Sequence, residues 1–223
     1  MKRIAVHAVI CLTLVSQLVG CVSPQPFSKE QFNRLKQYSA IHVIYFKPTE
    51  FQVEPPIFLS GGSLRLLMVP PKLLAAQFVI DNSLQDPTLE LREIVVGKLQ
   101  TDGQLNNLKI LQGGVEKNDW GVLHKQHEMT IAFTFETTQW AVIRGILDLS
   151  RYQSLYGVHV RLLDIRSFET FWERGCRVWG KAHTSDELKE GNAYLLKKEF
   201  HEAADTCSRE ILTDLIQKAL PSS

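Results

Sequence analysis

The chain has 223 residues, 44% hydrophobic and 22% charged, and a formal net charge of +1. At this length the chain can form one domain with a hydrophobic core of useful size. No block of Lys and Arg occurs anywhere, so the sequence lacks the electrostatic footprint of a nucleic-acid-binding protein.

Residues 1–20 have the layout of a secretory signal peptide. Lys2 and Arg3 form a short positive region, and residues 4–19 form an uncharged, largely apolar stretch. A bilayer-spanning helix needs about 20 predominantly apolar residues, and this run is shorter and is not followed by a cluster of positive charge. We therefore expect a cleaved signal rather than a transmembrane anchor.

The apolar stretch ends in Leu18-Val19-Gly20-Cys21, which resembles the lipobox of bacterial lipoproteins. The resemblance implies cleavage before Cys21, diacylglycerol on its sulfur and a fatty acid such as palmitate on the new amino group. Several acyl chains would hold the protein to membrane lipid, since one chain alone binds only reversibly. Val22 follows where lipoproteins retained in the inner membrane mainly have Asp, which favours the periplasmic face of the outer membrane. The alternative is an ordinary cleaved signal in which Cys21 is incidental.

Residues 21–27 are expected to form a lipid-anchored tether, because Ser23-Pro24-Gln25-Pro26 has two prolines and no apolar periodicity. Residues 28–223 then form a single α/β periplasmic domain. Cleavage leaves 203 residues and removes Lys2 and Arg3, which changes the formal net charge to −1.

Local signals in the first half of the domain predict three helices and two strands. The helices are residues 28–37, 72–81 and 87–101, the strands are residues 40–46 and 107–111, and Gly113-Gly114 is expected to form a turn. Ser28 and Gln31 form a capping-box pattern at the start of the first helix. The third helix follows an acidic cap, Asp86, and has Pro87 at its first position.

Residues 47–63 are rich in proline and glycine, so no regular β ladder is expected there. The segment is nevertheless too apolar for a freely solvated loop, because it contains Phe51, Ile57, Phe58 and Leu59. Two interpretations remain open. The segment folds over the domain's own core, or it offers an apolar docking surface to an envelope protein partner.

The second half of the domain alternates polar and apolar residues, which predicts strands. The expected strands are residues 130–135, with extended character continuing to 147, then 156–164 and a return strand within 168–179. Tyr156, Val158, Val160 and Leu162 are expected to point inward.

A long C-terminal helix is predicted from residue 185 onward. Its apolar residues recur at steps of three and four: Leu196, Phe200, Ala203, Cys207, Ile211 and Leu215. Cys176 and Cys207 remain after Cys11 leaves with the signal and Cys21 is lipidated, and an oxidising periplasm favours a disulfide between them. Such a bridge would join the helix to the sheet and stabilise the fold by roughly 3 kcal/mol. The alternatives, a redox couple and a metal site, lack a CxxC motif or metal-ligand spacing.

Several short motifs in the C-terminal half occur in an order that resembles a group of uncharacterised periplasmic lipoproteins of Gram-negative bacteria. They are Thr137-Thr138-Gln139-Trp140, Tyr156, residues 158–164, residues 172–176, Ser185-Asp186-Glu187-Leu188 and residues 203–207. The resemblance covers residues 135–215, implies an α/β lipoprotein domain and supplies no catalytic residues. A looser similarity, by fold analogy, is to accessory lipoproteins that dock on envelope transporters or cell-wall synthases.

The predicted fold class is α/β of the α+β type. We expect a mixed, mostly antiparallel sheet flanked by helices, with the long C-terminal helix packed on the sheet.

No catalytic, metal or cofactor site is predicted, and the protein is not expected to be an enzyme. Ser60-Gly61-Gly62 is better explained as a turn than as a nucleophile motif, and Glu50 and Glu54 are acids of a kind that usually lie on solvated faces. His124 and His127 lack a third ligand nearby. The expected function is a binding or scaffold module for envelope components. The alternatives are an accessory subunit of an envelope transport system and a cell-envelope hydrolase.

Overall fold

The computed structural model describes residues 27–48, 50–54, 71–116, 121, 129–145, 148 and 150–219. The predicted signal peptide, the lipidation residue Cys21, the apolar residues Ile57, Phe58 and Leu59, the glycine pair after Ser60, and His124 with His127 all lie outside the described residues.

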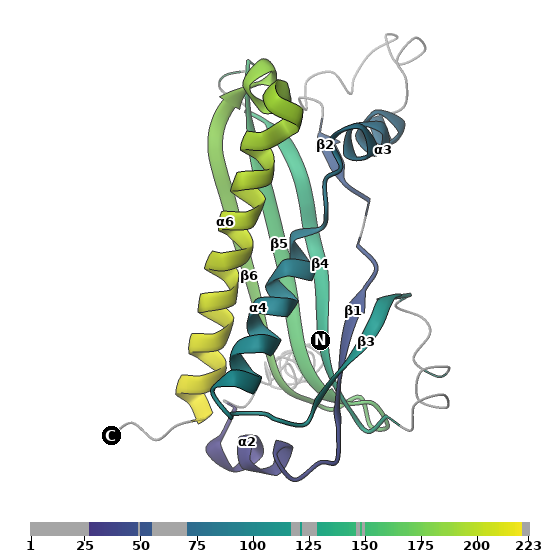
Figure 1. The fold of residues 1–223 in the computed structure, drawn as a ribbon, viewed down its shortest axis with the longest axis vertical. Coiled ribbons are helices and arrows are strands. Elements are labelled where there is room, and N and C mark those ends of the chain that lie inside the picture. The colour runs from purple at the N-terminus through teal and green to yellow at the C-terminus, as the bar shows by residue number, and fades with distance from the viewer. Residues whose placement is uncertain are drawn as a thin grey trace, which may run out of the picture.

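The described residues form helices and strands in the order that Figure 1 shows. The helices are α2 (Lys29–Leu35), α3 (Pro71–Asn82), α4 (Pro87–Thr101) and α6 (Ser185–Ala219), and the strands are β1 (Ile41–Phe46), β2 (Gln52–Glu54), β3 (Leu108–Val115), β4 (Ile131–Arg144), β5 (Arg151–Asp164) and β6 (Thr170–Thr184).

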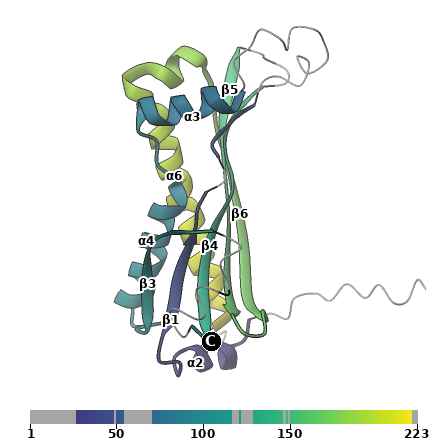
Figure 2. The same cartoon turned by 90° about the vertical axis from the view of Figure 1, so that its right-hand side faces the viewer.

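The strands form one mixed sheet in the order β3-β1-β4-β5-β6, with β2 also paired to β4. The parallel pairs are β1 with β3, β1 with β4 and β2 with β4, and they are short. The two long pairs, β4 with β5 and β5 with β6, are antiparallel. Helices α3, α4 and α6 lie on the same side of this sheet (Figure 2). The predicted α+β class and the packing of the long C-terminal helix on the sheet are confirmed.

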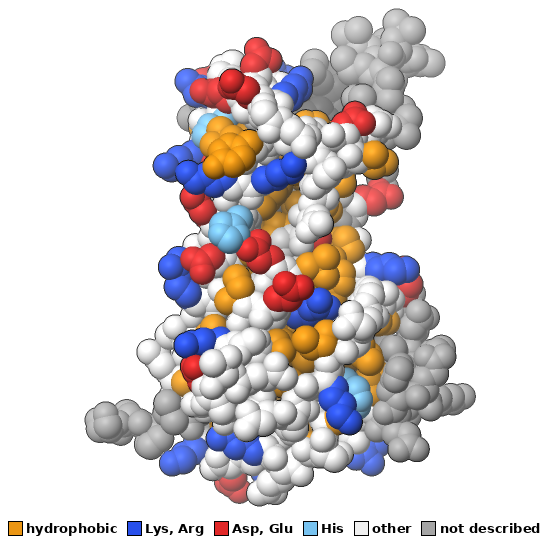
Figure 3. Space-filling model, in the orientation of Figure 1, with side chains coloured by type: hydrophobic (Ala, Val, Ile, Leu, Met, Phe, Trp, Pro, Cys, Tyr) orange, Lys and Arg blue, Asp and Glu red, His pale blue; other side chains and the backbone are white. Residues whose placement is uncertain are grey.

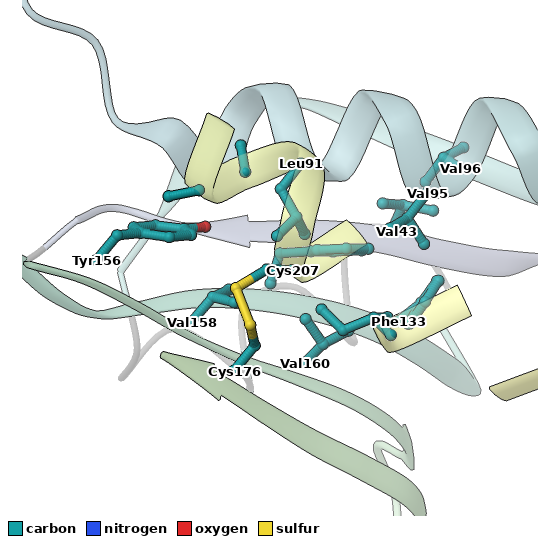
Figure 4. Packing of buried hydrophobic residues seen from close by; sticks show 14 of the residues in the cluster. Val43, Leu91, Val95, Val96, Phe133, Tyr156, Val158, Val160, Cys176 and Cys207 are labelled. Carbon is teal, nitrogen blue, oxygen red and sulfur yellow. A yellow bond between two sulfur atoms is a disulfide. The ribbon is translucent and has the colours of Figure 1, made fainter. Parts of the chain in front are cut away.

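The main core lies between the sheet and helices α4 and α6 (Figure 4). The inward residues predicted for β5 are buried, as are Ile131, Phe133 and Phe135 of β4, because alternate side chains of a strand share one face. A second, smaller cluster is built from the intervening positions: Ile44, Phe46, Met129, Ala132, Leu163 and Ile165. The centre of the sheet therefore has apolar side chains on both faces.

The capping signals predicted the starts of two helices correctly. Ser28 and Gln31 make both hydrogen bonds of the capping box at α2. Asp86 caps α4, where its side chain accepts a hydrogen bond of 3.0 Å from the Thr88 N–H. These are local interactions within one turn of a helix, which is why the sequence alone predicted them.

Three sequence expectations were wrong in detail. Gly113-Gly114 is not a turn but part of β3, where Gly113 has a φ of 81° at an irregularity in the pairing with β1. The segment rich in proline does contain a strand, β2. This strand can form because it spans only Gln52–Glu54, and none of these residues is a proline. The strand predicted over residues 156–164 begins earlier than expected, since β5 starts at Arg151.

The long C-terminal helix is interrupted near its start. Residues 190–193 have non-helical backbone angles, with positive φ at Gly191, Asn192 and Ala193. Gly and Asn are the residues that adopt this left-handed conformation most readily. Beyond the interruption, the predicted stripe from Leu196 to Leu215 is buried against the sheet.

Cys176 of β6 and Cys207 of α6 form a disulfide, with their Cα atoms 5.6 Å apart. Both cysteines are buried in the main core, beside Val158 (Figure 4). The bond joins the helix to the edge strand on which it packs, as the sequence predicted. Cross-linking residues 31 positions apart stabilises a fold by about 3 kcal/mol.

A buried carboxylate makes a second link between α6 and the sheet. Glu199 accepts hydrogen bonds from the Ser154 hydroxyl at 2.6 Å and from the Lys181 N–H at 3.0 Å, and its carboxylate lies 2.7 Å from the His183 ring nitrogen Nε2. A Cβ atom at Gly180 would collide with both the Ser154 hydroxyl and the Glu199 carboxylate. Glycine is therefore required at position 180 for the carboxylate to reach the strand.

This requirement can be tested by placing one methyl group on β6. We expect Gly180→Ala to lower the free energy of unfolding by about 2 kcal/mol, because the methyl group displaces a buried carboxylate from its donors. Gly175→Ala on the same strand is the matched control, since the nearest atom to its Cβ would be 3.9 Å away. Urea unfolding of both variants measures the difference. Equal free energies of unfolding for the two variants would show that glycine is not required at position 180.

Candidate ligand pocket

The predicted docking residue Phe51 lies inside the protein. Its side chain is 5% exposed, and its ring centroid lies 5.1 Å from that of Trp140, 6.2 Å from that of Phe78 and 6.3 Å from that of Phe200. The docking prediction is therefore wrong for Phe51, because its ring is part of an aromatic cluster in the core. The alternative interpretation, that the segment folds over the core, is correct at this residue.

A neighbouring residue of the same segment lines a pocket of about 320 Å³ at the end of the sheet where β2 and α3 lie. The walls are mainly apolar, with a hydroxyl and an ammonium group from α6. The lining residues are Val53, Phe78, Val142, Tyr152, Ser185, Leu188, Lys189 and Leu196. In the view of Figure 3, hydrophobic side chains lie in the furrow between α6 and the elements beside it.

Two features of the fold build this pocket. The parallel pairing of β2 with β4 places Val53 directly opposite Val142, so both side chains contribute to one wall. The interruption of α6 separates Leu188 from Leu196, and both residues still line the pocket. In an uninterrupted helix the first turn would continue along the axis of the rest of α6. The interruption therefore sets the direction from which Leu188 reaches the pocket.

The chemistry of the lining suits an apolar ligand with an anionic end. Pockets of roughly 300 Å³ or more, with mostly apolar walls and a few polar groups, are typical of small-molecule sites. Leu188, Leu196 and Val142 are buried, whereas Lys189 is exposed at the edge. An alkyl chain could therefore displace water from the apolar walls while a negative group remains beside Lys189.

A buried polar network joins α4 to the sheet. Asp86 accepts a hydrogen bond from the Tyr45 hydroxyl at 2.6 Å and another from the Thr137 hydroxyl. The Thr88 hydroxyl lies 2.7 Å from that of Thr137 and 2.9 Å from that of Tyr156. The sequence predicted Asp86 only as a helix cap, because its partners on β1 and β4 are 41 and 51 positions away.

Burial raises the pKa of both tyrosines in this network above the usual value near 10. The Asp86 carboxylate raises the pKa of Tyr45 further, because a phenolate beside it would be repelled. Both phenols therefore stay protonated in the folded protein at pH values where they ionise in the unfolded chain.

Sequence analysis did not find the pocket, although it marked the segment that contains Val53. The lining residues come from two helices and three strands, which no local pattern connects. Among the described residues, no group of three or more His, Cys, Asp or Glu side chains could hold a metal ion. The same residues contain no helix long and apolar enough to cross a membrane.

No known family model and no curated protein matches the sequence. Solved structures do align with the chain. XCC0632 from Xanthomonas campestris, of family DUF330, is 12% identical over 79% of this chain and 83% of its own, with a TM-score of 0.39. PelC from Paraburkholderia phytofirmans, a dodecamer, is 10% identical over 88% and 94%, with a TM-score of 0.32. Lipoprotein GNA1162 from Neisseria meningitidis is 11% identical over 77% and 97%, with a TM-score of 0.31. Such low TM-scores support no inference about ligand, partner or assembly.

The tyrosine network predicts a specific loss of stability in alkali. A group whose pKa is raised by folding stabilises the protein fully below its unfolded pKa, and this contribution is lost as the pH rises above about 10. We expect the double variant Tyr45→Phe, Tyr156→Phe to lose stability less steeply above pH 10, by up to about 1.4 kcal/mol per pH unit for each tyrosine. Urea unfolding between pH 8 and pH 11 measures the slope.

The control for this experiment is Tyr194→Phe, because the Tyr194 side chain is exposed on α6. Its slope should equal that of the parent. A double variant that follows the parent slope would show that the two buried phenols ionise as freely in the folded state as in the unfolded chain.

Proposed function

We propose that this protein is a lipid-anchored binding module of the bacterial envelope, held at the periplasmic face of the outer membrane. Its ligand is an amphiphile with an alkyl chain and an anionic end, bound in the pocket between α3, α6 and strands β2, β4 and β5. The observation that carries the proposal is the pairing of six apolar lining residues with Lys189 in one pocket of ligand size.

The anchor part of the proposal is supported by the sequence Leu18-Val19-Gly20-Cys21, which follows a stretch typical of a signal peptide. The first described residue, Phe27, is six positions after Cys21. Diacylglycerol and palmitate on Cys21 would leave the folded domain close to the membrane surface. The presence of Val22 after the cysteine supports the outer membrane.

The binding part is supported by the fixed shape of the pocket. The disulfide and the Glu199 hydrogen bonds hold α6 on the sheet, and the β2–β4 pairing fixes Val53 against Val142. A preformed pocket loses little conformational freedom when a ligand enters, which favours affinity. The domain can therefore bind an apolar group without rearranging its core.

The anchor is tested with the full chain expressed in a Gram-negative host. We expect the parent to incorporate labelled palmitate and to sediment with outer membranes, and Cys21→Ser to lose both properties, because the acyl chains have no attachment point. Cys11→Ser is the matched control and should behave like the parent. Membrane sedimentation of Cys21→Ser without label, equal to the parent, would contradict the anchor.

The pocket is tested with protein that begins at Val22, titrated with cis-parinaric acid, a fluorescent 18-carbon fatty acid. We expect Val142→Phe to weaken binding at least tenfold, because the larger side chain takes up space within the pocket that Val142 lines. We expect Lys189→Gln to weaken binding about threefold through loss of the positive charge.

Matched controls separate these effects from general damage. Lys198→Gln removes an exposed lysine of the same helix that does not line the pocket, and Ile110→Phe enlarges an exposed side chain on β3. Both should bind the fatty acid like the parent. Unchanged affinity in Val142→Phe, or no saturable binding by the parent, would refute the proposed site.

A further inference from the structure

The turn between β5 and β6 presents an aromatic side chain to solvent. Phe168 is 60% exposed, and its φ of 57° is in the left-handed region. This conformation is costly for a bulky side chain, by roughly 1 kcal/mol or more, and exposure of the ring adds an apolar surface in water. The turn therefore keeps an aromatic ring largely exposed at the surface in spite of this cost.

The turn is held rigidly by its own hydrogen bonds. The Asp164 carboxylate accepts hydrogen bonds from the Arg166 and Ser167 N–H groups at 2.7 and 3.2 Å. The Asp164 N–H donates to the Glu169 carbonyl oxygen at 2.9 Å, which closes the turn. Ile165 is buried beneath it. The backbone on both sides of Phe168 is therefore held by hydrogen bonds.

This turn lies at the end of the molecule where the described chain begins. Gln31, Arg34 and Tyr38, in or just after α2, line one small cavity together with Glu169 and Phe171 at the start of β6. Figures 1 and 2 show α2 and the β5–β6 turn at the same end of the sheet. Cys21 lies six positions before Phe27, so the proposed anchor lies within about 20 Å of this end.

The exposed charges of α2, its flanking residues and the β5–β6 turn are predominantly positive. Lys29, Arg34 and Lys36 lie in or beside α2 and Arg166 lies in the turn, whereas the exposed acids of the same two segments are Glu30 and Glu169. Lys and Arg side chains are spread around the lower end of the molecule in Figure 3. Each basic residue near an anionic bilayer contributes about 1 kcal/mol of attraction.

We infer that the end formed by α2 and the β5–β6 turn is a membrane-contacting surface, with the Phe168 ring inserted among the lipid headgroups. The inference rests on the proposed Cys21 anchor, which supplies the bilayer within reach. An aromatic ring on a fixed turn suits the interfacial region, and the basic residues around it match anionic phospholipid headgroups. The anchor sets the distance to the membrane, and this surface sets the orientation of the domain.

The orientation has a consequence for the ligand pocket. Strands β4 and β5 have 14 residues each and run the length of the domain, which corresponds to about 45 Å. The pocket lies at the end of the sheet opposite the turn. With Phe168 in the headgroups, the pocket faces the periplasmic space and not the leaflet that holds the anchor.

The test uses the full, lipidated protein reconstituted into vesicles of phosphatidylethanolamine and phosphatidylglycerol. Phe168→Cys is labelled with the environment-sensitive dye NBD, since the other mature cysteines are lipidated or in the disulfide. Trp179→Cys, labelled in the same way, is the matched control, because Trp179 is exposed on β6 away from the turn. Spin-labelled lipids in the vesicles quench a dye that enters the bilayer.

We expect the dye at position 168 to be quenched at least threefold more than the dye at position 179, with a blue-shifted emission. Equal quenching at the two positions, in protein that floats with the vesicles, would overturn the inference and leave the anchor intact. Failure of the parent protein to float with the vesicles would overturn the anchor and the inference together. Flotation and quenching therefore separate the two failures.

Discussion

The packing of α6 along β6 is the constraint on which the rest of the structure depends. Three contacts fix the helix against the strand at successive levels: Glu199 with the backbone of Lys181, Cys207 with Cys176, and Asp214 with the Trp172 indole N–H at 2.9 Å. As the residue numbers rise along α6, those of their partners on β6 fall, so the helix and the strand run antiparallel. The apolar stripe of α6 must then face the sheet throughout its length.

That fixed register explains why the helix is interrupted where it is. The stripe begins at Leu196, and the chain arrives from the end of β6 at Thr184, so the intervening residues must redirect the chain. Positive φ values at Gly191, Asn192 and Ala193 accomplish this within one turn. The redirected first turn brings Leu188 and Lys189 to the wall of the pocket. The pocket is thus a consequence of how the longest helix joins the longest hairpin.

The two proposed roles, membrane contact and ligand binding, lie at opposite ends of the molecule. The lower end has the start of the described chain, the basic residues of α2 and the exposed Phe168, and the opposite end has the apolar pocket. The buried networks of Asp86 and Glu199 lie between them and hold helices to the sheet. A stiff sheet between the ends would hold the pocket at a constant height above the membrane, which suits a module that presents a ligand or receives one.

The sequence by itself determined the features that depend on neighbouring residues: the caps at Ser28 and Asp86, the inward face of β5, and the apolar stripe that contains Cys207. These follow from the periodicity of helices and strands and from hydrogen bonds within one turn. Only the tertiary structure decided the pairing of β2 with β4, the burial of Phe51 and the pocket, because each depends on residues far apart in the chain. An apolar side chain signals burial in the same way whether it packs in a core or lines a pocket, and only the arrangement of the surrounding elements distinguishes the two.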